Sequence, residues 1–173
     1  PAIANSGSKV KPGDFDGDGD IDLFVGGRIV PRSYPLPATS LILKNESENG
    51  SAKFTSVAST VCPTLDSIGL VTDAAWVDFN GDNSLDLVVV GEWMPITVFE
   101  NDGNGKLLNA TEKLGLENTL GWWYSIAAAD FDGDGDVDFA AGNLGLNYKY
   151  QASEEQSFDV YANDYDKNGS LDI

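Results

Sequence analysis

The sequence predicts an all-β fold, a partial β-propeller of about three four-stranded blades. Two observations support this prediction. An aspartate-rich motif recurs four times in 173 residues, and each copy lies among short runs rich in Val, Ile, Leu and aromatic residues. Repeated small sheets of roughly 50 residues are typical of propellers, in which the sheets pack face to face around an axis. A β-sandwich or a β-solenoid is the alternative.

The repeated motif reads DFDGDGDIDLF from Asp14, DFNGDNSLDLVVV from Asp78, DFDGDGDVDFAA from Asp130 and DYDKNGSLDI from Asp164. Each copy leads directly into an apolar run, as expected where a tight loop enters a strand. Aspartates this close together repel one another, so a cluster without a ligand would cost stability. The motif therefore predicts a bound cation.

The runs around the motifs divide the chain into three predicted blades. The first, at about residues 8–62, has strands at IDLFV, TSLILKN and KFTSV. The second, at about 68–112, has LVTDAAWV, LDLVVVG, ITVFEND and KLLNAT, and the third, at about 122–173, has YSIAAAD, VDFAAG and FDVYAND. An Asn near the end of each third run precedes a Gly-containing hairpin, which places the fourth motif in the last hairpin of the third blade. A fourth repeat that begins early is the alternative. Helix is expected for one or two turns at most, within residues 110–118.

The first motif has the spacing of a calcium loop. Numbered from Asp14, it carries Asp at positions 1, 3, 5 and 9 and Gly at position 6, and position 7 offers a backbone carbonyl. Alternate side chains of a tight loop can face one centre, and such oxygen ligands suit Ca²⁺ better than Mg²⁺, which requires a stricter octahedral geometry. An EF-hand requires Glu at position 12, where this chain has Val25, Val89 and Ala141, so an EF-hand is excluded.

These motifs resemble the FG-GAP/VCBS repeat proteins, whose blades carry DxDxDGxxD calcium loops between the first two strands, as in the propeller of integrin α subunits. The segments GGRIVPRSYPLPATSLILKN, GEWMPITVFEND and GWWYSIAAADFDGDGDVDFAAGNLGLN are most similar to secreted bacterial proteins of the ASPIC/UnbV and cartilage-acidic-protein type. The resemblance covers nearly the whole chain and implies Ca²⁺ as the cofactor. The metal ligands that it implies are Asp14, Asp16, Asp18, Asp20, Asp22, Asp78, Asn80, Asp82, Ser84, Asp86, Asp130, Asp132, Asp134, Asp136 and Asp138.

Two loops depart from the pattern. In the second, Asn80 replaces an aspartate, so we expect weaker binding, and Asn83 replaces the turn glycine, which Asn tolerates because it enters the left-handed region more readily than most residues. The fourth loop has a lysine beside position 5, and whether this loop binds an ion is left open. Its candidate ligands are Asp164, Asp166, Asn168, Ser170 and Asp172. Solvated acidic turns without an ion are the alternative for every loop.

Composition excludes several other functions. The net charge is −18 and the pI is near 4.1, which disfavours nucleic acid or an anionic membrane as a partner and attracts divalent cations. The absence of histidine excludes imidazole catalysis and histidine metal sites. The single cysteine, Cys62, cannot form an intrachain disulfide and is expected to be a small buried hydrophobic residue. No apolar run is long enough to insert into a membrane.

Two groups of residues outside the loops are candidates for ligand binding. Trp93, Trp122, Trp123 and Tyr124 fall near predicted strand ends, where they form either a platform for sugar rings or packing between blades. The segment GGRIVPRSYPLP, with Arg28 and Arg32, is a long connection that can overhang one face, and such loops often carry binding.

The sequence therefore predicts a non-catalytic, calcium-binding repeat module of a secreted or cell-surface protein, in adhesion or ligand binding, with a protein or glycan as its ligand. The alternative is a calcium-dependent polysaccharide lyase or hydrolase, although no nucleophile and base pair is evident outside the loops. We expect the chain to be a segment of a longer protein. Such a segment would leave apolar blade faces exposed, including alternate residues of LDLVVV and SIAAA. We expect these faces either to associate with a second copy of the chain or to be covered by further blades.

Overall fold

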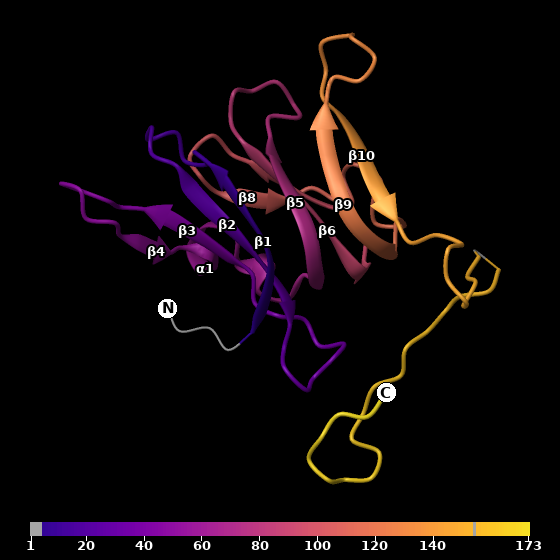
Figure 1. The fold of residues 1–173 in the computed structure, drawn as a ribbon. Helices are drawn as coiled ribbons and strands as arrows, with labels where there is room; N and C mark the ends of the chain where they lie inside the picture. Colours follow the sequence, from indigo (N-terminus) through magenta and orange to yellow (C-terminus); the bar gives the residue numbers. More distant parts are fainter. Residues whose placement is uncertain (1–4, 154) are drawn as a thin grey trace.

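The computed structural model describes residues 5–153 and 155–173, and it confirms an all-β chain built on antiparallel sheets (Figure 1). The first sheet has four strands in chain order, β1 to β4. Its bounds are Ser6–Gly13 for β1, Asp22–Ile29 for β2, Leu41–Asn45 for β3 and Phe54–Ser56 for β4.

The second sheet repeats this meander and adds a hairpin. Strands β5 to β8 pair in order, and β9 joins the sheet at β6 through only two residue pairs, Glu92 with Trp122 and Met94 with Gly121. The hairpin of β9 and β10 therefore branches from one end of the meander. The bounds are Leu70–Val77 for β5, Asp86–Met94 for β6, Thr97–Asn101 for β7, Leu107–Asn109 for β8, Gly121–Ala129 for β9 and Asp138–Asn143 for β10.

The β5–β8 meander is buried on both faces. Leu87 and Val89 of β6 pack in one apolar cluster with Phe24 of the first sheet. Val88 and Val90, which alternate with them, pack in a second cluster with Ile126 of β9. Because successive side chains of a strand point to opposite faces, a strand covered on both sides has a continuous apolar run. The prediction that alternate residues of LDLVVV are exposed was therefore wrong.

The strands form three units, β1–β4, β5–β8 and the β9–β10 hairpin. The first strands of these units lie side by side, since β5 contacts both β1 and β9. Asp73 of β5 links all three strands. Its carboxylate forms a 2.8 Å ion pair with Lys11 of β1 and accepts a 3.2 Å hydrogen bond from the backbone N–H of Ile126 in β9. Burial alone would raise the pKa of Asp73, but these hydrogen bonds lower it below its usual value, so the carboxylate stays charged.

The third predicted blade is incomplete. The run FDVYAND, residues 158–164, is not a strand, and among the described residues β10 pairs only with β9. Figure 1 shows the C-terminal part of the chain running away from the sheets. Its Tyr161 is 71% exposed, whereas Phe99, at the same place in the second meander, is fully buried between two layers. In the part of the chain that the structure describes, no layer covers the matching face of the third unit, so extending the sheet there gains little burial.

The short helices lie between β4 and β5. They are α1 (Ala58–Val61) and the 3₁₀ helix η1 (Pro63–Ser67), and they place Cys62 and Leu65 in the first apolar cluster. Cys62 is fully buried, as predicted, and burial raises the pKa of its thiol to about 11. The expected turns within residues 110–118 form without a helix. In the described part of the chain, no helix is long and apolar enough to cross a membrane.

Candidate metal-binding loops

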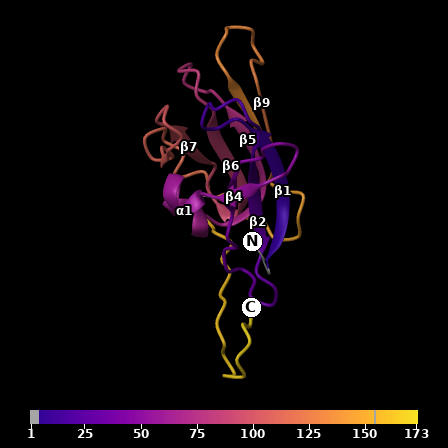
Figure 2. The ribbon, with the colours of Figure 1, turned by 90° about the vertical axis from the view of Figure 1, so that its left-hand side faces the viewer.

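All four aspartate motifs form loops of one geometry. In each, an antiparallel residue pair closes the loop, with position 9 paired to the residue just before position 1. The pairs are Gly13 with Asp22, Val77 with Asp86, Ala129 with Asp138, and Asn163 with Asp172. The first three loops join adjacent strands at one edge of the molecule, and the fourth lies far from them at the C-terminal end (Figures 1 and 2).

The first position of each loop organises the turn. Its carboxylate accepts a hydrogen bond from the backbone N–H of position 6, at 3.0 Å from Gly19, 2.8 Å from Asn83, 3.0 Å from Gly135 and 2.9 Å from Gly169. Position 6 has a φ between 68° and 98° in every loop. Asn83 adopts this left-handed conformation as predicted, since Asn tolerates it better than most non-glycine residues.

Position 9 holds the loop to the sheet. Asp22 accepts hydrogen bonds from the backbone N–H of Phe15 within the loop, at 3.4 Å, and of Asn45 in β3, at 2.7 Å. Asp86 repeats this with Phe79 at 3.2 Å and Asn101 at 2.7 Å. Both carboxylates are fully buried, and burial raises the pKa of each although these hydrogen bonds oppose it. Asp22 and Asp86 thus have a structural role that the ligand spacing alone did not indicate.

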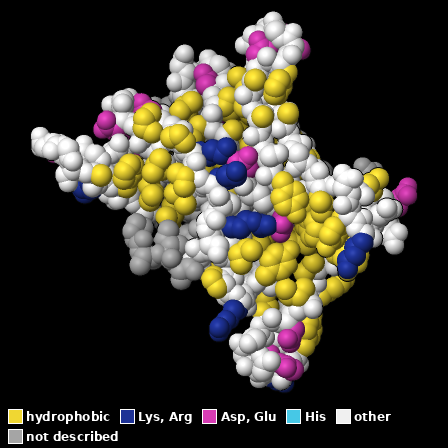
Figure 3. Space-filling view, in the orientation of Figure 1, with side chains coloured by type: hydrophobic (Ala, Val, Ile, Leu, Met, Phe, Trp, Pro, Cys, Tyr) yellow, Lys and Arg dark blue, Asp and Glu magenta, His cyan; other side chains and the backbone are white. Residues whose placement is uncertain are grey.

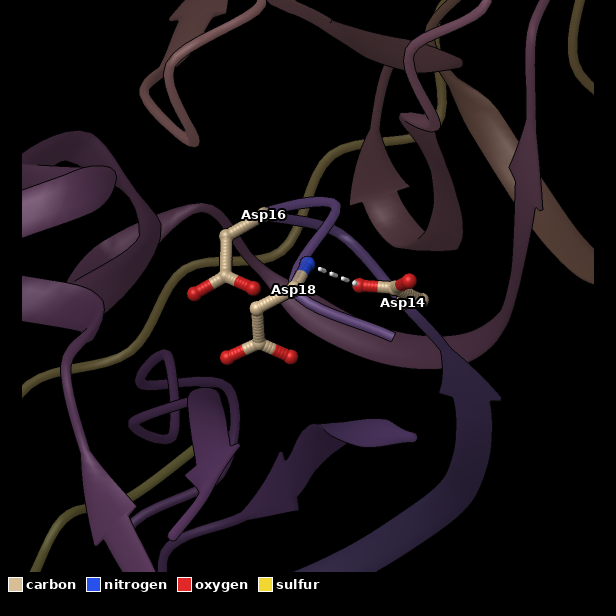
Figure 4. Close-up of side chains that lie close together, drawn as sticks. All are labelled: Asp14, Asp16 and Asp18. Carbon is tan, nitrogen blue, oxygen red and sulfur yellow. Dashed lines mark hydrogen bonds between the residues drawn. The ribbon is translucent and has the colours of Figure 1, made fainter. Parts of the chain in front are cut away.

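Carboxylates converge in three of the loops. In each of three groups, one carboxylate oxygen from every residue lies within 4.8 Å of those of the others. In the first loop, Asp16 and Asp18 lie side by side, and Asp14 accepts a 3.1 Å hydrogen bond from the backbone N–H of Asp18 (Figure 4). The groups are Asp14, Asp16 and Asp18; Asp130, Asp132 and Asp138; and Asp164, Asp166 and Asp172.

The predicted ligands at positions 5 and 7 are joined by a hydrogen bond in every loop. The backbone N–H of position 7 donates to the side chain of position 5 in every loop, from Asp20 at 3.0 Å, Ser84 at 2.8 Å, Asp136 at 3.0 Å and Ser170 at 2.8 Å. Asp20 is exposed, as are Asp134 and Asp136. In the second loop, Asn80 donates a 3.0 Å hydrogen bond to Asp82, so an amide takes part where the other loops have a carboxylate.

Lys44 of β3 enters the first loop. Its ammonium forms ion pairs with Asp16 and, at 3.0 Å, with Asp18. A hydrogen bond from the backbone of Asp20, with help from Lys44, lowers the pKa of Asp18, and the contacts with both carboxylates raise the pKa of Lys44. Lys44 also lines a hollow of about 740 Å³ beside this loop. A strand residue 28 positions from Asp16 was not identifiable as part of the site from loop spacing.

The second loop has a carboxylate where the first has this lysine. Glu100 precedes Asn101 in β7 as Lys44 precedes Asn45 in β3, and both asparagines donate to the position 9 carboxylate of their loop. A Glu100 oxygen lies 3.4 Å from the Asn80 amide nitrogen, and Lys113 pairs with the other at 2.7 Å. Two equivalent strand positions therefore place opposite charges beside two similar loops.

Comparison with known families finds a match over part of the chain. Residues 78–141 match the family model of the FG-GAP-like repeat. The chain contains an FG-GAP-like repeat. The match begins at the first aspartate of the second loop and ends inside β10, so the FG-GAP-like repeat spans one loop, the rest of its meander and the next loop. No curated protein sequence matches the chain. The first loop lies outside the matched residues and has the same geometry as the loops of the FG-GAP-like repeat.

The aromatic candidates separate into two groups. Trp123 packs in the second apolar cluster and donates a 2.8 Å hydrogen bond to the Thr119 carbonyl, as the packing alternative predicted. Trp93 and Trp122 are half-buried and meet edge to face at 4.9 Å, and Tyr124 is 43% exposed. These three lie at the ends of β6 and β9 away from the loops.

Proposed function

We propose that this chain is a non-catalytic, calcium-binding repeat module of a secreted or cell-surface protein, in adhesion or ligand binding. The observation that carries the proposal is one hydrogen-bonded loop geometry repeated four times, with carboxylates gathered in three of the loops. The FG-GAP-like repeat supports a module of this kind. Titration of the protein with calcium, followed by calorimetry, tests the proposal directly.

The residues of the first loop fit a calcium ion. Asp16 Oδ1 is buried and has no hydrogen-bond partner, while Oδ2 faces Lys44. A buried oxygen without a partner is destabilising, and carboxylate oxygens are the ligands that Ca²⁺ prefers. We infer that Asp14, Asp16 and Asp18 would hold the ion. Its contribution is to neutralise their repulsion and so to hold the ends of β1 and β2 together.

The competing proposal is a calcium-dependent polysaccharide lyase or hydrolase. Such an enzyme needs an acid and base pair in addition to the calcium ligands. A reducing-end assay over a panel of polysaccharides, in calcium, separates the two proposals. Release of new reducing ends by the purified protein would favour the enzyme.

We expect Lys44→Met to strengthen calcium binding at the first loop several-fold. The ammonium and the ion compete for Asp16 and Asp18, and methionine removes the charge at similar length. The measurement is an NMR calcium titration that follows the backbone amide of Gly19, which is hydrogen-bonded to Asp14.

Asp16→Ala should abolish calcium binding at the first loop, and Asp20→Ala serves as the control because Asp20 is exposed and offers its carbonyl. Equal losses from Asp16→Ala and Asp20→Ala would contradict the proposed ligands.

We also propose that the open face of the third unit associates with a second copy of the chain. Phe15, at position 2 of the first loop, is 3% exposed because it stacks on Trp76 of the next unit at 6.0 Å. Phe131, at the same position of the third loop, is 58% exposed. Light scattering is expected to show a dimer that Phe131→Ser weakens and Leu108→Ser, at a 60% exposed position on β8, leaves unchanged. A monomer at every concentration would refute the self-association.

A further inference from the structure

A buried polar network lies at the strand ends away from the metal-binding loops. At its centre is Glu92 of β6, whose side chain is only 9% exposed. Its carboxylate accepts hydrogen bonds from Arg28 Nη2 at 2.6 Å, from the Tyr124 hydroxyl at 3.3 Å and from the Tyr34 hydroxyl at 3.5 Å. Arg28 is on β2 and Tyr124 on β9, so the network joins all three units. Burial and the charge of Glu92 raise the pKa of both tyrosines, which keeps their hydroxyls protonated.

An aromatic cluster adjoins this network. Trp93 and Trp122 meet edge to face, and Tyr150 stacks on Phe158 at 4.8 Å with an interplanar angle of 15°. Tyr148 and Tyr150 are 40% and 46% exposed. Figure 3 shows hydrophobic side chains gathered near the end of the β9–β10 hairpin away from its loop, with charged side chains beside them. The cluster comprises Trp93, Trp122, Tyr148, Tyr150 and Phe158.

The backbone at Trp93 is held in an unfavourable conformation. Its φ is +61°, in the left-handed region that bulky residues avoid, and a shift in the pairing of β6 with β9 occurs at the same residue. The indole donates a 2.6 Å hydrogen bond to the Tyr34 hydroxyl, which fixes the ring against the network. Strain of this kind persists where the surroundings impose it and is common at ligand sites.

Two N–H groups of this region have no acceptor. Arg28 Nη1 and Trp122 Nε1 are buried and have no partner among the described residues, while Glu92 is already engaged by three donors. Unpaired buried donors are rare and costly. Both nitrogen atoms lie beneath the surface. The network therefore includes buried donor nitrogens that the described protein groups do not satisfy.

We propose that the Arg28–Glu92 network and the adjoining aromatic cluster bind a neutral saccharide. Aromatic rings offer an apolar face to the C–H face of a sugar, and the tyrosine hydroxyls and Arg28 offer polar partners for its hydroxyls. A neutral sugar fits better than an acidic one for two reasons. Glu92 already balances the charge of Arg28 at 2.6 Å, and a net charge of −18 repels polyanions.

This inference gives a ligand class to the binding role proposed above, and its test is separate from calcium binding. With calcium at saturation, the intact protein is titrated with hexaoses of cellulose, xylan, chitin, laminarin and mannan, and with hexagalacturonate as the acidic probe. Tryptophan fluorescence and calorimetry report binding. We expect at least one neutral hexaose to bind, and Tyr150→Ala and Tyr124→Phe each to weaken it about tenfold. Tyr161→Ala is the matched control, since Tyr161 is 71% exposed outside the cluster.

Each other outcome overturns the inference. Binding of hexagalacturonate alone would exclude a neutral saccharide, and no binding of any probe would exclude a saccharide site. Equal weakening by Tyr161→Ala would place the site elsewhere. Loss of a dimer in light scattering on Tyr150→Ala, without any sugar binding, would make the cluster a protein interface. Calorimetry in calcium without sugar shows separately whether the metal-binding proposal holds.

Discussion

Calcium at about 2 mM is expected to raise the melting temperature of this protein by several degrees. Sites with Kd values of about 10⁻⁴–10⁻³ M, as in extracellular modules, would each contribute roughly 0.6–1.8 kcal/mol at that concentration. Three sites together would contribute about 2–5 kcal/mol, and a chain of this size gains about 2–4 °C per kcal/mol. The three sites are those of the first three loops, and the physical reason is plainest in the first and third, where the ion neutralises carboxylates that the fold holds within 4.8 Å of one another.

Scanning calorimetry of the protein in a chelator and in calcium measures this shift. Magnesium at the same concentration is the control, since it demands stricter geometry and should stabilise the protein less. Sodium chloride at matched ionic strength controls for screening of the −18 net charge. An unchanged melting temperature in calcium would contradict the structural role proposed for the ion.

Asp86→Ala is expected to destabilise the ion-free protein by about 2–4 kcal/mol. The Asp86 carboxylate is fully buried and accepts the backbone N–H groups of Phe79 and Asn101. Alanine would leave both donors, Phe79 in the loop and Asn101 in β7, without an acceptor, and each unpaired buried group costs about 1–3 kcal/mol. Urea unfolding in a chelator measures the loss without any contribution from calcium.

Asp172→Ala is the matched control for this prediction. Asp172 occupies position 9 of the fourth loop and accepts a 3.0 Å hydrogen bond from Tyr165, but it is only half-buried and lies outside the sheets. Its removal should cost less than 1 kcal/mol in the same experiment. Equal losses from the two variants would show that burial does not distinguish the two positions.

Much of the loop geometry is local, and for this reason the sequence predicted it. Hydrogen bonds within each loop join residues two to seven positions apart, such as Gly19 with Asp14 and Phe15 with Asp22. Five of the six strands that flank the first three loops were also predicted, because alternating apolar residues and tight turns specify a meander, but β1, which precedes the first loop, was not. The apolar run of β6 was predicted to be a strand, but its burial on both faces was not predicted.

The sequence by itself determined the four loops, the left-handed residues that turn them and the all-β class, because each depends on neighbours within a few positions. Tertiary structure alone decided the charge beside each loop, since Lys44 and Glu100 reach their loops from other strands. It also assembled Arg28, Glu92 and Tyr124 from three strands. The third unit has only two strands because strand formation also depends on a second layer of structure that covers the sheet. The sequence of residues 158–164 does not indicate whether such a layer is present.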